Sequence, residues 1–252
     1  MVSTESAIKT EEIAYGEDKK LKGVFAYDSS KKEKLPGVLI VHDGFGPGER
    51  FHKRAIQLAE MGYVGFAIDM YGDGPKASCH INLKDVQAVI EDQFKNFDKT
   101  LARFQLAYDL LKNHEKCDGR IAAMGYCYGG AIVLNAARAG LDLKGVASFH
   151  GSLEPLTTSE KGKFTGKALV CNGEIDPAVK PEVIEAFKKE FTDLGIDYKF
   201  VNYPGAKHGF ALPEATQRGI DLGLTAMLEY NEKADKDSWA DFDELLKTIF
   251  AK

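Results

Sequence analysis

The segment 125–129 reads GYCYG and places Cys127 where a short apolar stretch runs into a helix-like one. It matches the strand-turn-helix motif G-x-S-x-G, whose central residue is a nucleophile, with sulfur in place of oxygen. The flanking glycines leave room where the chain crosses itself at a tight turn. A helix beginning here brings partial positive charge to the sulfur, which favours a thiolate. Cys127 is therefore a candidate nucleophile, the alternative being a buried structural cysteine at an ordinary turn.

Two further residues that can do chemistry follow strand-like segments later in the chain. Asp176 comes after the apolar run 167–171, and His208 comes after the alternating run 198–203. Open α/β sheets carry their active sites at the carboxyl ends of the strands. Hydrolases with this kind of turn supply nucleophile, acid and histidine in that chain order. Either residue alone is typical of a helix cap or a solvated loop, but together with Cys127 they predict a catalytic triad.

These motifs resemble the dienelactone hydrolase family, the cysteine-nucleophile branch of the α/β-hydrolases. The likeness covers nearly the whole chain, and besides the segments around Cys127 and His208 the matching stretches are 38–46, 65–74, 149–153 and 230–239. The resemblance implies an α/β-hydrolase fold, with a mostly parallel central sheet flanked by helices, in one domain over 1–252. It also implies hydrolysis of a small ester or lactone by acyl transfer to Cys127. We expect neither a cofactor nor a metal ion.

Strand and helix patterns alternate along the chain, which favours the same architecture. Strands are predicted near 38–42, 63–69, 120–125, 144–149, 167–171 and 198–203, with an antiparallel edge hairpin within 10–36. Apolar residues at helical spacing predict helices over 51–61, 101–111 and 181–194. Ser238, with Asp241 three residues later, predicts the start of a final helix. The polar segment 72–98 either overhangs the site or forms a solvated loop.

The reaction assigns a role to each residue around the nucleophile. His208 would act as base and then as acid, with Asp176 orienting its imidazole. Tyr128, the residue after the nucleophile, would supply one backbone N–H to an oxyanion hole, and the resemblance implies Gly44 as the second donor. Asp43 stands where the family's best-known members carry a glutamate that helps to activate the cysteine, and its side chain is one methylene shorter.

Four other positions bear on activation and on the substrate. His42 and His150 lie near predicted strand ends, where a lone histidine is typically structural, and His150 stays a candidate for thiol activation or substrate contact. The family's characterised lactonases bind a substrate carboxylate with two arginines, and those positions here hold Asp73 and Leu212. An anion and an apolar group would repel a carboxylate or fail to pair with it. A neutral or cationic small ester or lactone therefore fits better than a true dienelactone.

Composition excludes several other classes of protein. A formal charge of −5 argues against a nucleic-acid partner, and without a long apolar run we expect no membrane partner. The first ten residues lack the apolar core of a signal peptide. Four cysteines in 252 residues make no disulfide framework. We expect a cytoplasmic protein whose partner is a small molecule.

Three other functions have partial support in the sequence: dinucleotide binding, thiol redox sensing and binding of a small molecule without catalysis. The glycines of 44–48 do not make a dinucleotide-binding loop, because Glu49 and Phe51 stand where the motif needs glycine. A thiol redox sensor at Cys127 would need a resolving partner, and the sequence has no C-x-x-C motif. A catalytically silent protein that uses the hydrolase fold to bind a small molecule stays open, since fold does not imply function.

The residues at positions 73 and 212 lead to a prediction on selectivity. Anionic lactones should be poorer substrates than neutral esters of similar size by about 10- to 150-fold in kcat/KM, because a charge-assisted pair contributes about 1.5–3 kcal/mol. Combining Asp73→Arg with Leu212→Arg should shift the ratio of the two kcat/KM values toward a carboxylated lactone. A wild type that already prefers the carboxylated lactone would contradict this prediction and point to another cation, such as Lys76 or Lys207.

Overall fold

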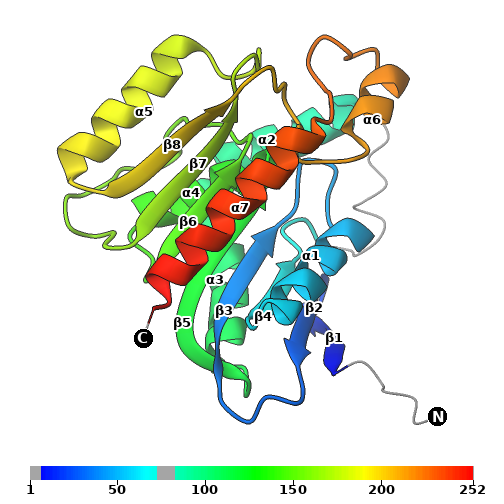
Figure 1. The fold of residues 1–252 in the computed structure, drawn as a ribbon, viewed down its shortest axis with the longest axis vertical. Helices are drawn as coiled ribbons and strands as arrows, with labels where there is room; N and C mark the ends of the chain where they lie inside the picture. Colours follow the sequence, from blue (N-terminus) through cyan, green and yellow to red (C-terminus); the bar gives the residue numbers. More distant parts are fainter. Residues whose placement is uncertain (1–6, 73–82, 252) are drawn as a thin grey trace.

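The structure, a computed structural model, describes residues 7–72 and 83–251 and contains an eight-stranded sheet (Figure 1). The strand order is β1-β2-β4-β3-β5-β6-β7-β8. The strands are β1 (Ile8–Tyr15), β2 (Leu21–Asp28), β3 (Leu35–Val41), β4 (Val64–Ile68), β5 (Cys117–Tyr126), β6 (Gly145–Phe149), β7 (Lys167–Gly173) and β8 (Asp197–Tyr203). All pairs from β4 to β8 are parallel, whereas β1 and β2 form an antiparallel hairpin at one edge. The predicted mostly parallel sheet is confirmed.

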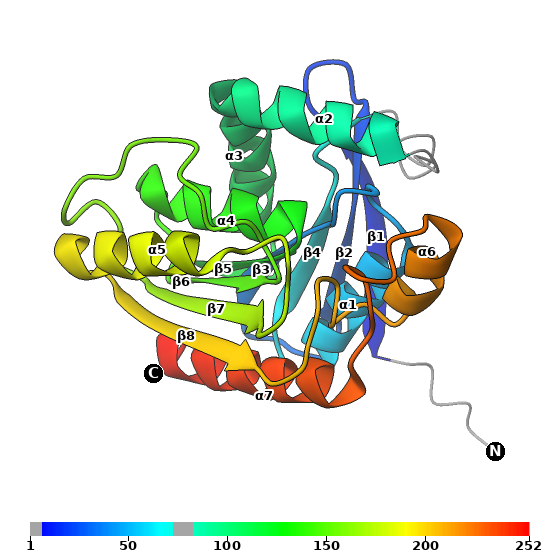
Figure 2. The same ribbon diagram turned by 90° about the horizontal axis from the view of Figure 1, so that it is seen from above.

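Helices cover both faces of this sheet (Figure 2). They are α1 (Glu49–Glu60), α2 (Leu83–Lys95), α3 (Phe97–Asn113), α4 (Tyr128–Arg138), α5 (Pro181–Leu194), α6 (Ala215–Asp221) and α7 (Glu232–Ile249). Helices α1 and α7 pack on one face, and α3, α4 and α5 pack on the other. None of the helices in the described part of the chain is long and apolar enough to cross a bilayer.

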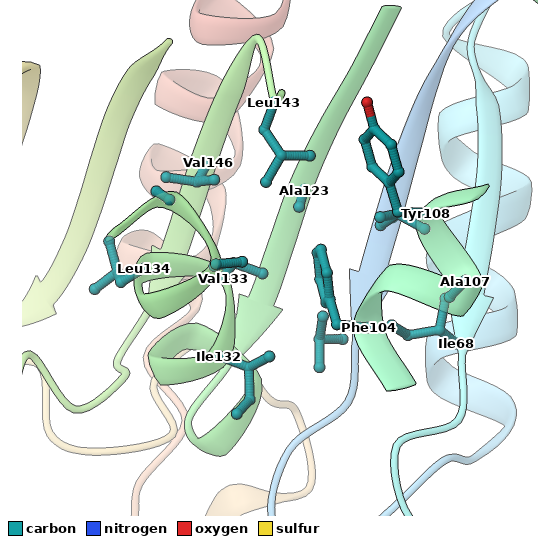
Figure 3. Packing of buried hydrophobic residues seen from close by; sticks show 14 of the residues in the cluster. Ile68, Phe104, Ala107, Tyr108, Ala123, Ile132, Val133, Leu134, Leu143 and Val146 are labelled. Carbon is teal, nitrogen blue, oxygen red and sulfur yellow. The ribbon is translucent and has the colours of Figure 1, made fainter. Parts of the chain in front are cut away.

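The central strands are apolar along their length because both of their faces are buried. In β3, Leu39 and Val41 join the core layer under α3 and α4, while Val38 and Ile40 join the layer under α1 and α7. This division follows from the alternation of side chains along a strand. Figure 3 shows the first layer at close range, where α3 and α4 pack side by side against the sheet through residues such as Phe104.

The final helix begins earlier than the sequence pattern predicts. Helix α7 starts at Glu232, and the side chain of Asn231 accepts a hydrogen bond from the N–H of Ala234 at 3.0 Å. Ser238 lies inside the helix, where its hydroxyl donates to the carbonyl of Asp235 at 3.0 Å. The prediction of Ser238 as the N-cap is therefore wrong. Serine can bond back to the preceding turn as well as cap a helix, and asparagine caps equally well.

The polar segment 72–98 is helical over much of its length. Helix α2 covers Leu83–Lys95 and packs against α3, with Val86 and Gln93 buried. Asp73 and Lys76, named above for their bearing on the substrate, lie outside the described residues. In the described part of this segment, Leu83, Val86 and Ile90 of α2 line the cavity that contains Cys127.

The contact between α1 and β4 depends on Gly65. A Cβ atom at this position would lie 2.6 Å from the carbonyl oxygen of Ala55 and 2.8 Å from its Cα. Because these are backbone atoms, Gly65→Ala would push α1 away from the sheet, and we expect it to lower the free energy of unfolding by about 1–3 kcal/mol. Lys53→Ala, on the exposed side of the same helix, should change it by less than about 0.5 kcal/mol. Equal urea midpoints for the two variants would show that the helix has room to move.

Candidate active site

Three side chains that are far apart in the sequence meet at one edge of the sheet. Cys127 follows β5, Asp176 follows β7 and His208 follows β8. Strands β5, β6, β7 and β8 are neighbours in that order and run parallel. The loops after them therefore open at the same edge, as in other open α/β sheets.

The three side chains form a continuous hydrogen-bonded chain. Cys127 Sγ and His208 Nε2 are 3.1 Å apart, and His208 Nδ1 and Asp176 Oδ2 are 2.8 Å apart. The other carboxylate oxygen of Asp176 accepts the N–H of Ala178 at 2.8 Å. The Asp176 side chain is fully buried, and that of His208 is 13% exposed. The carboxylate is thus held in place, and it orients the imidazole toward the sulfur.

The turn that carries Cys127 is strained and tightly packed. Cys127 has φ 51° and ψ −112°, in the positive-φ region that non-glycine residues rarely adopt. A Cβ at Gly125 would lie 2.2 Å from the backbone of Gly129, and a Cβ at Gly129 would lie 2.5 Å from the carbonyl oxygens of Val41 and His42. Both glycines of the motif are required by close backbone contacts. The strained turn places the sulfur at the start of α4.

The charges around His208 favour its protonated form. Burial by itself lowers the pKa of this imidazole, but the negative charge of a Cys127 thiolate and the hydrogen bond to Asp176 outweigh burial and raise the pKa well above its ordinary value. An imidazolium between a carboxylate and a sulfur can stabilise a thiolate and can later return the proton. This is the arrangement expected of an activated nucleophile.

Of the two predicted oxyanion-hole residues, Tyr128 directly follows Cys127 in the chain, and Gly44 lines the cavity beside Cys127. Tyr128 is the first residue of α4, and N–H groups at the start of a helix have no partner within it. Gly44 follows β3, and its carbonyl accepts a hydrogen bond from the hydroxyl of Tyr71 at 3.0 Å. Gly44 and Cys127 line one cavity. The locations of Tyr128 and Gly44 near Cys127 are compatible with N–H donation from both residues. Their role in an oxyanion hole stays a prediction.

The carboxylate of Asp43 is bound by arginines and not by the cysteine. Its Oδ2 lies 3.0 Å from Arg218 Nη1 and 3.7 Å from Arg50 Nη2, while its Oδ1 accepts the N–H of Phe45 at 2.9 Å. Glu214 also pairs with both arginines. Within the described residues, no hydrogen bond or ion pair joins Asp43 to Cys127. Asp43 therefore stabilises the loop that contains Gly44, in a network where two anions face two cations.

A small cavity of about 130 Å³ opens beside Cys127 and His208. Its wall is mostly apolar and comes from α2, α6 and the loops around them; the apolar members are Phe45, Leu83, Val86, Ile90, Leu212, Ala215, Leu224, Met227 and Leu228. Leu212 thus lines the cavity beside the candidate nucleophile, and its contact with substrate stays a prediction. Among the described residues, no group of three or more His, Cys, Asp or Glu side chains is arranged to hold a metal ion.

The structure adds one pocket residue that sequence reasoning missed. Arg218 lines the cavity, and its guanidinium stacks over the ring of Phe45 at 3.9 Å. The sequence offered only a weak signal, an arginine four residues after Glu214 on a short helix. Lys207, the cation named above, pairs instead with Glu229 and donates to the carbonyl of Thr225. The pocket therefore contains a cation, but one that Asp43 already neutralises.

The two histidines near strand ends have different surroundings. His42 Nδ1 donates to the carbonyl of Asp43 at 2.6 Å, and its Nε2 accepts the N–H of Met70 at 3.1 Å. Both nitrogens of His42 are thus used to tie the end of β3 to the end of β4, as expected of a structural histidine. His150 is fully buried and lines the cavity, and neither of its ring nitrogens has a hydrogen-bond partner among the described residues.

Comparison with known proteins gives the class. The family model of the dienelactone hydrolase family matches residues 22–250, so the chain belongs to this family and is a hydrolase of the ester and lactone type. The "Putative carboxymethylenebutenolidase" of Synechocystis sp. is 24% identical over 233 residues, which is 84% of this chain and 86% of the relative. An uncharacterized protein of Caenorhabditis elegans is 31% identical over 156 residues, 61% of this chain and 96% of that protein.

Among solved structures, similarity extends over nearly the full chain. The crystal structure of a dienelactone hydrolase-like promiscuous phosphotriesterase from metagenomic libraries is 30% identical, with a TM-score of 0.88, and the match covers 97% of this chain and 100% of that one.

The buried histidines predict how stability depends on pH. Burial lowers the pKa of His42, and it lowers that of His150 well below the ordinary value, helped there by the charge of His208. Below about pH 6.5 the unfolded chain binds protons that the folded chain does not, so the free energy of unfolding should fall as the pH falls from 6.5 to 5. Each of the two groups contributes up to about 1.4 kcal/mol per pH unit.

Urea unfolding at several pH values between 6.5 and 5 measures this slope. His52 and His114, which are about half buried, also have lowered pKa values and add to the slope. His150→Asn removes one of the two fully buried histidines and should reduce the slope by up to about one proton. A wild-type free energy that is constant over this interval would contradict the prediction.

Proposed function

We propose that this protein hydrolyses small, uncharged esters or lactones through a thioester intermediate on Cys127. One observation carries the proposal: the hydrogen-bonded chain from Cys127 Sγ through His208 to Asp176 opens into a small apolar cavity. Membership of the dienelactone hydrolase family supports the reaction class.

In the first half of the reaction, the sulfur of Cys127 attacks the carbonyl carbon and forms a tetrahedral oxyanion. The backbone N–H groups of Tyr128 and Gly44 stabilise the negative charge on that oxygen. The carbon–oxygen bond to the leaving group then breaks, and His208 gives its proton to the departing alkoxide. For a lactone, the alcohol stays attached to the acyl group as the ring opens.

In the second half, the neutral imidazole of His208 takes a proton from a water molecule, and the resulting hydroxide attacks the thioester. Asp176 stabilises the imidazolium that forms and keeps Nε2 directed at the reacting atoms. Breakdown of the second tetrahedral intermediate releases the carboxylic acid and restores the sulfur and the imidazolium. The step consumes one water and needs no other reactant.

The cavity limits the size and the charge of the substrate's acyl group. A cavity of about 130 Å³ is smaller than the roughly 300–1,000 Å³ of typical ligand pockets, so we expect a short acyl group. The apolar wall and the neutralised Asp43–Arg218 pair favour an uncharged acyl group over a carboxylate. A substrate screen should also include a phosphotriester, because a similar solved structure is described as a promiscuous phosphotriesterase.

Selective loss of activity tests the triad. His208→Ala should lower kcat by several orders of magnitude, and Asp176→Asn should lower it by about 10³–10⁴-fold because it favours the wrong imidazole tautomer. Stoichiometric iodoacetamide should label Cys127 and abolish hydrolysis of a nitrophenyl ester. Burial raises the pKa of Cys171 to about 12 and also raises that of Cys117, so these thiols should not react.

Peptide mass spectrometry identifies the labelled cysteine, and Cys117→Ala serves as the matched control that keeps wild-type activity. Full activity in alkylated enzyme would exclude Cys127 as the nucleophile. Wild-type rates in a folded His208→Ala protein, checked by circular dichroism, would exclude the triad. A wild type that binds short esters without cleaving them would favour the silent binding protein instead.

A further inference from the structure

One side chain in the pocket wall has no part in the proposed triad and no hydrogen-bond partner within residues 7–72 and 83–251. His150 follows β6, the neighbour of the strand that carries Cys127, and it lines the same cavity as Cys127 and His208. The imidazole is fully buried, and neither nitrogen has a hydrogen-bond partner among the described residues. Leaving a buried polar group unpaired is destabilising, because the group loses its bonds to water and gains none in return. At the wall of a substrate cavity, such a group is available to a ligand.

The neighbours of His150 hold the ring in place without pairing with it. Its ring centroid lies 5.2 Å from that of His208 and 5.3 Å from that of Phe210, both in edge-on geometry. The ring of Tyr126 lies 5.9 Å away. The imidazole is thus fixed by aromatic packing.

The backbone at this position is also strained. His150 has φ 41°, a conformation that is unfavourable for a non-glycine residue and persists only where the surroundings impose it. The N–H of His150 is bound to the carbonyl of Cys171 at 2.8 Å, which fixes the turn after β6. A strained turn and unpaired ring nitrogens are two separate observations at one pocket residue.

The charge state of His150 defines what it can bind. Burial, with the positive charges of His208 and Arg50, lowers its pKa well below the ordinary value. A neutral imidazole offers one N–H donor and one acceptor nitrogen. This combination suits a hydroxyl group, which also donates and accepts, and it does not compensate the charge of a carboxylate.

We propose that His150 is a specificity-determining residue that hydrogen-bonds a hydroxyl group on the acyl part of the substrate, close to the reacting carbonyl. The inference rests on the proposed function, and it narrows the substrate class to short hydroxy-acyl esters or lactones. The position of the hydroxyl is limited by the small cavity and by the 5.2 Å between the rings of His150 and His208. The acyl part is chosen because it stays in the cavity as the thioester after the alcohol has left.

Matched substrates test the assignment. Ethyl butyrate is compared with ethyl 2-hydroxybutyrate and ethyl 3-hydroxybutyrate, and kcat/KM is measured by titrating the acid released. For each protein, the readout is kcat/KM for the hydroxy ester divided by kcat/KM for the plain ester. The intrinsic reactivity of the esters cancels when this ratio is compared between proteins. His150→Phe should reduce this ratio by about 10- to 100-fold for at least one hydroxy ester, mainly through KM, because the hydrogen bond is lost.

Two variants serve as controls. His150→Asn keeps one donor and one acceptor and should retain part of the preference. Leu212→Val alters the same wall without a polar atom, and it should change the rates for plain and hydroxy esters by similar factors.

The outcomes separate the inference from the proposed function. If the wild type is active and His150→Phe lowers kcat/KM by the same factor for all the esters, His150 only positions its neighbour His208 and the inference is wrong. An unchanged ratio in an active His150→Phe enzyme would also overturn it. A wild type that hydrolyses none of these esters or the short lactones would overturn the proposed function first.

Discussion

The close approach of the β5–α4 turn to its neighbours is the constraint on which the site depends. Gly125 lies against the backbone of Gly129, which in turn lies against the end of β3. This packing holds Cys127 at positive φ, sets the start of α4 behind the sulfur and leaves the N–H of Tyr128 beside it. A side chain at either glycine would separate α4 from the sheet. The candidate nucleophile, the helix start and the proposed oxyanion donor Tyr128 would then all move together.

Three histidines with the same side chain differ in their hydrogen bonds and in the charges around them. His208 lies between a carboxylate and a sulfur, so it can carry a proton despite its burial. His42 uses both nitrogens in hydrogen bonds to the backbone. The ring nitrogens of His150 have no hydrogen-bond partner in the described part of the chain, and the cations His208 and Arg50 near the ring oppose its protonation. Location relative to charges, and not residue type, therefore decides which imidazole can exchange protons with a substrate.

The pocket differs from the triad in how it is built. The triad comes from the ends of β5, β7 and β8, which the sheet itself aligns. The pocket wall comes from α2, α6 and the loops after β3 and β8. Several of these segments are distant from one another in the sequence, and the sheet does not align them. Arg218 and Asp43 neutralise each other within this wall. The reaction class thus follows from the scaffold, while the choice of substrate follows from the segments added to it.

The sequence by itself determined the features that depend on local periodicity and chain order. Buried parallel strands are apolar along their length, so most of the sheet could be predicted. The GYCYG turn and the residues that follow β7 and β8 predicted Cys127, Asp176 and His208 as a catalytic triad. Local pattern was insufficient at Ser238, because a serine bonds back inside a helix as readily as it caps one. The tertiary structure alone decided that Arg218 neutralises Asp43, that α2 lines the pocket and that the ring nitrogens of His150 are buried with no hydrogen-bond partner among the described residues. These are contacts between segments distant in the sequence, and their geometry depends on how the whole chain packs, which no local pattern records.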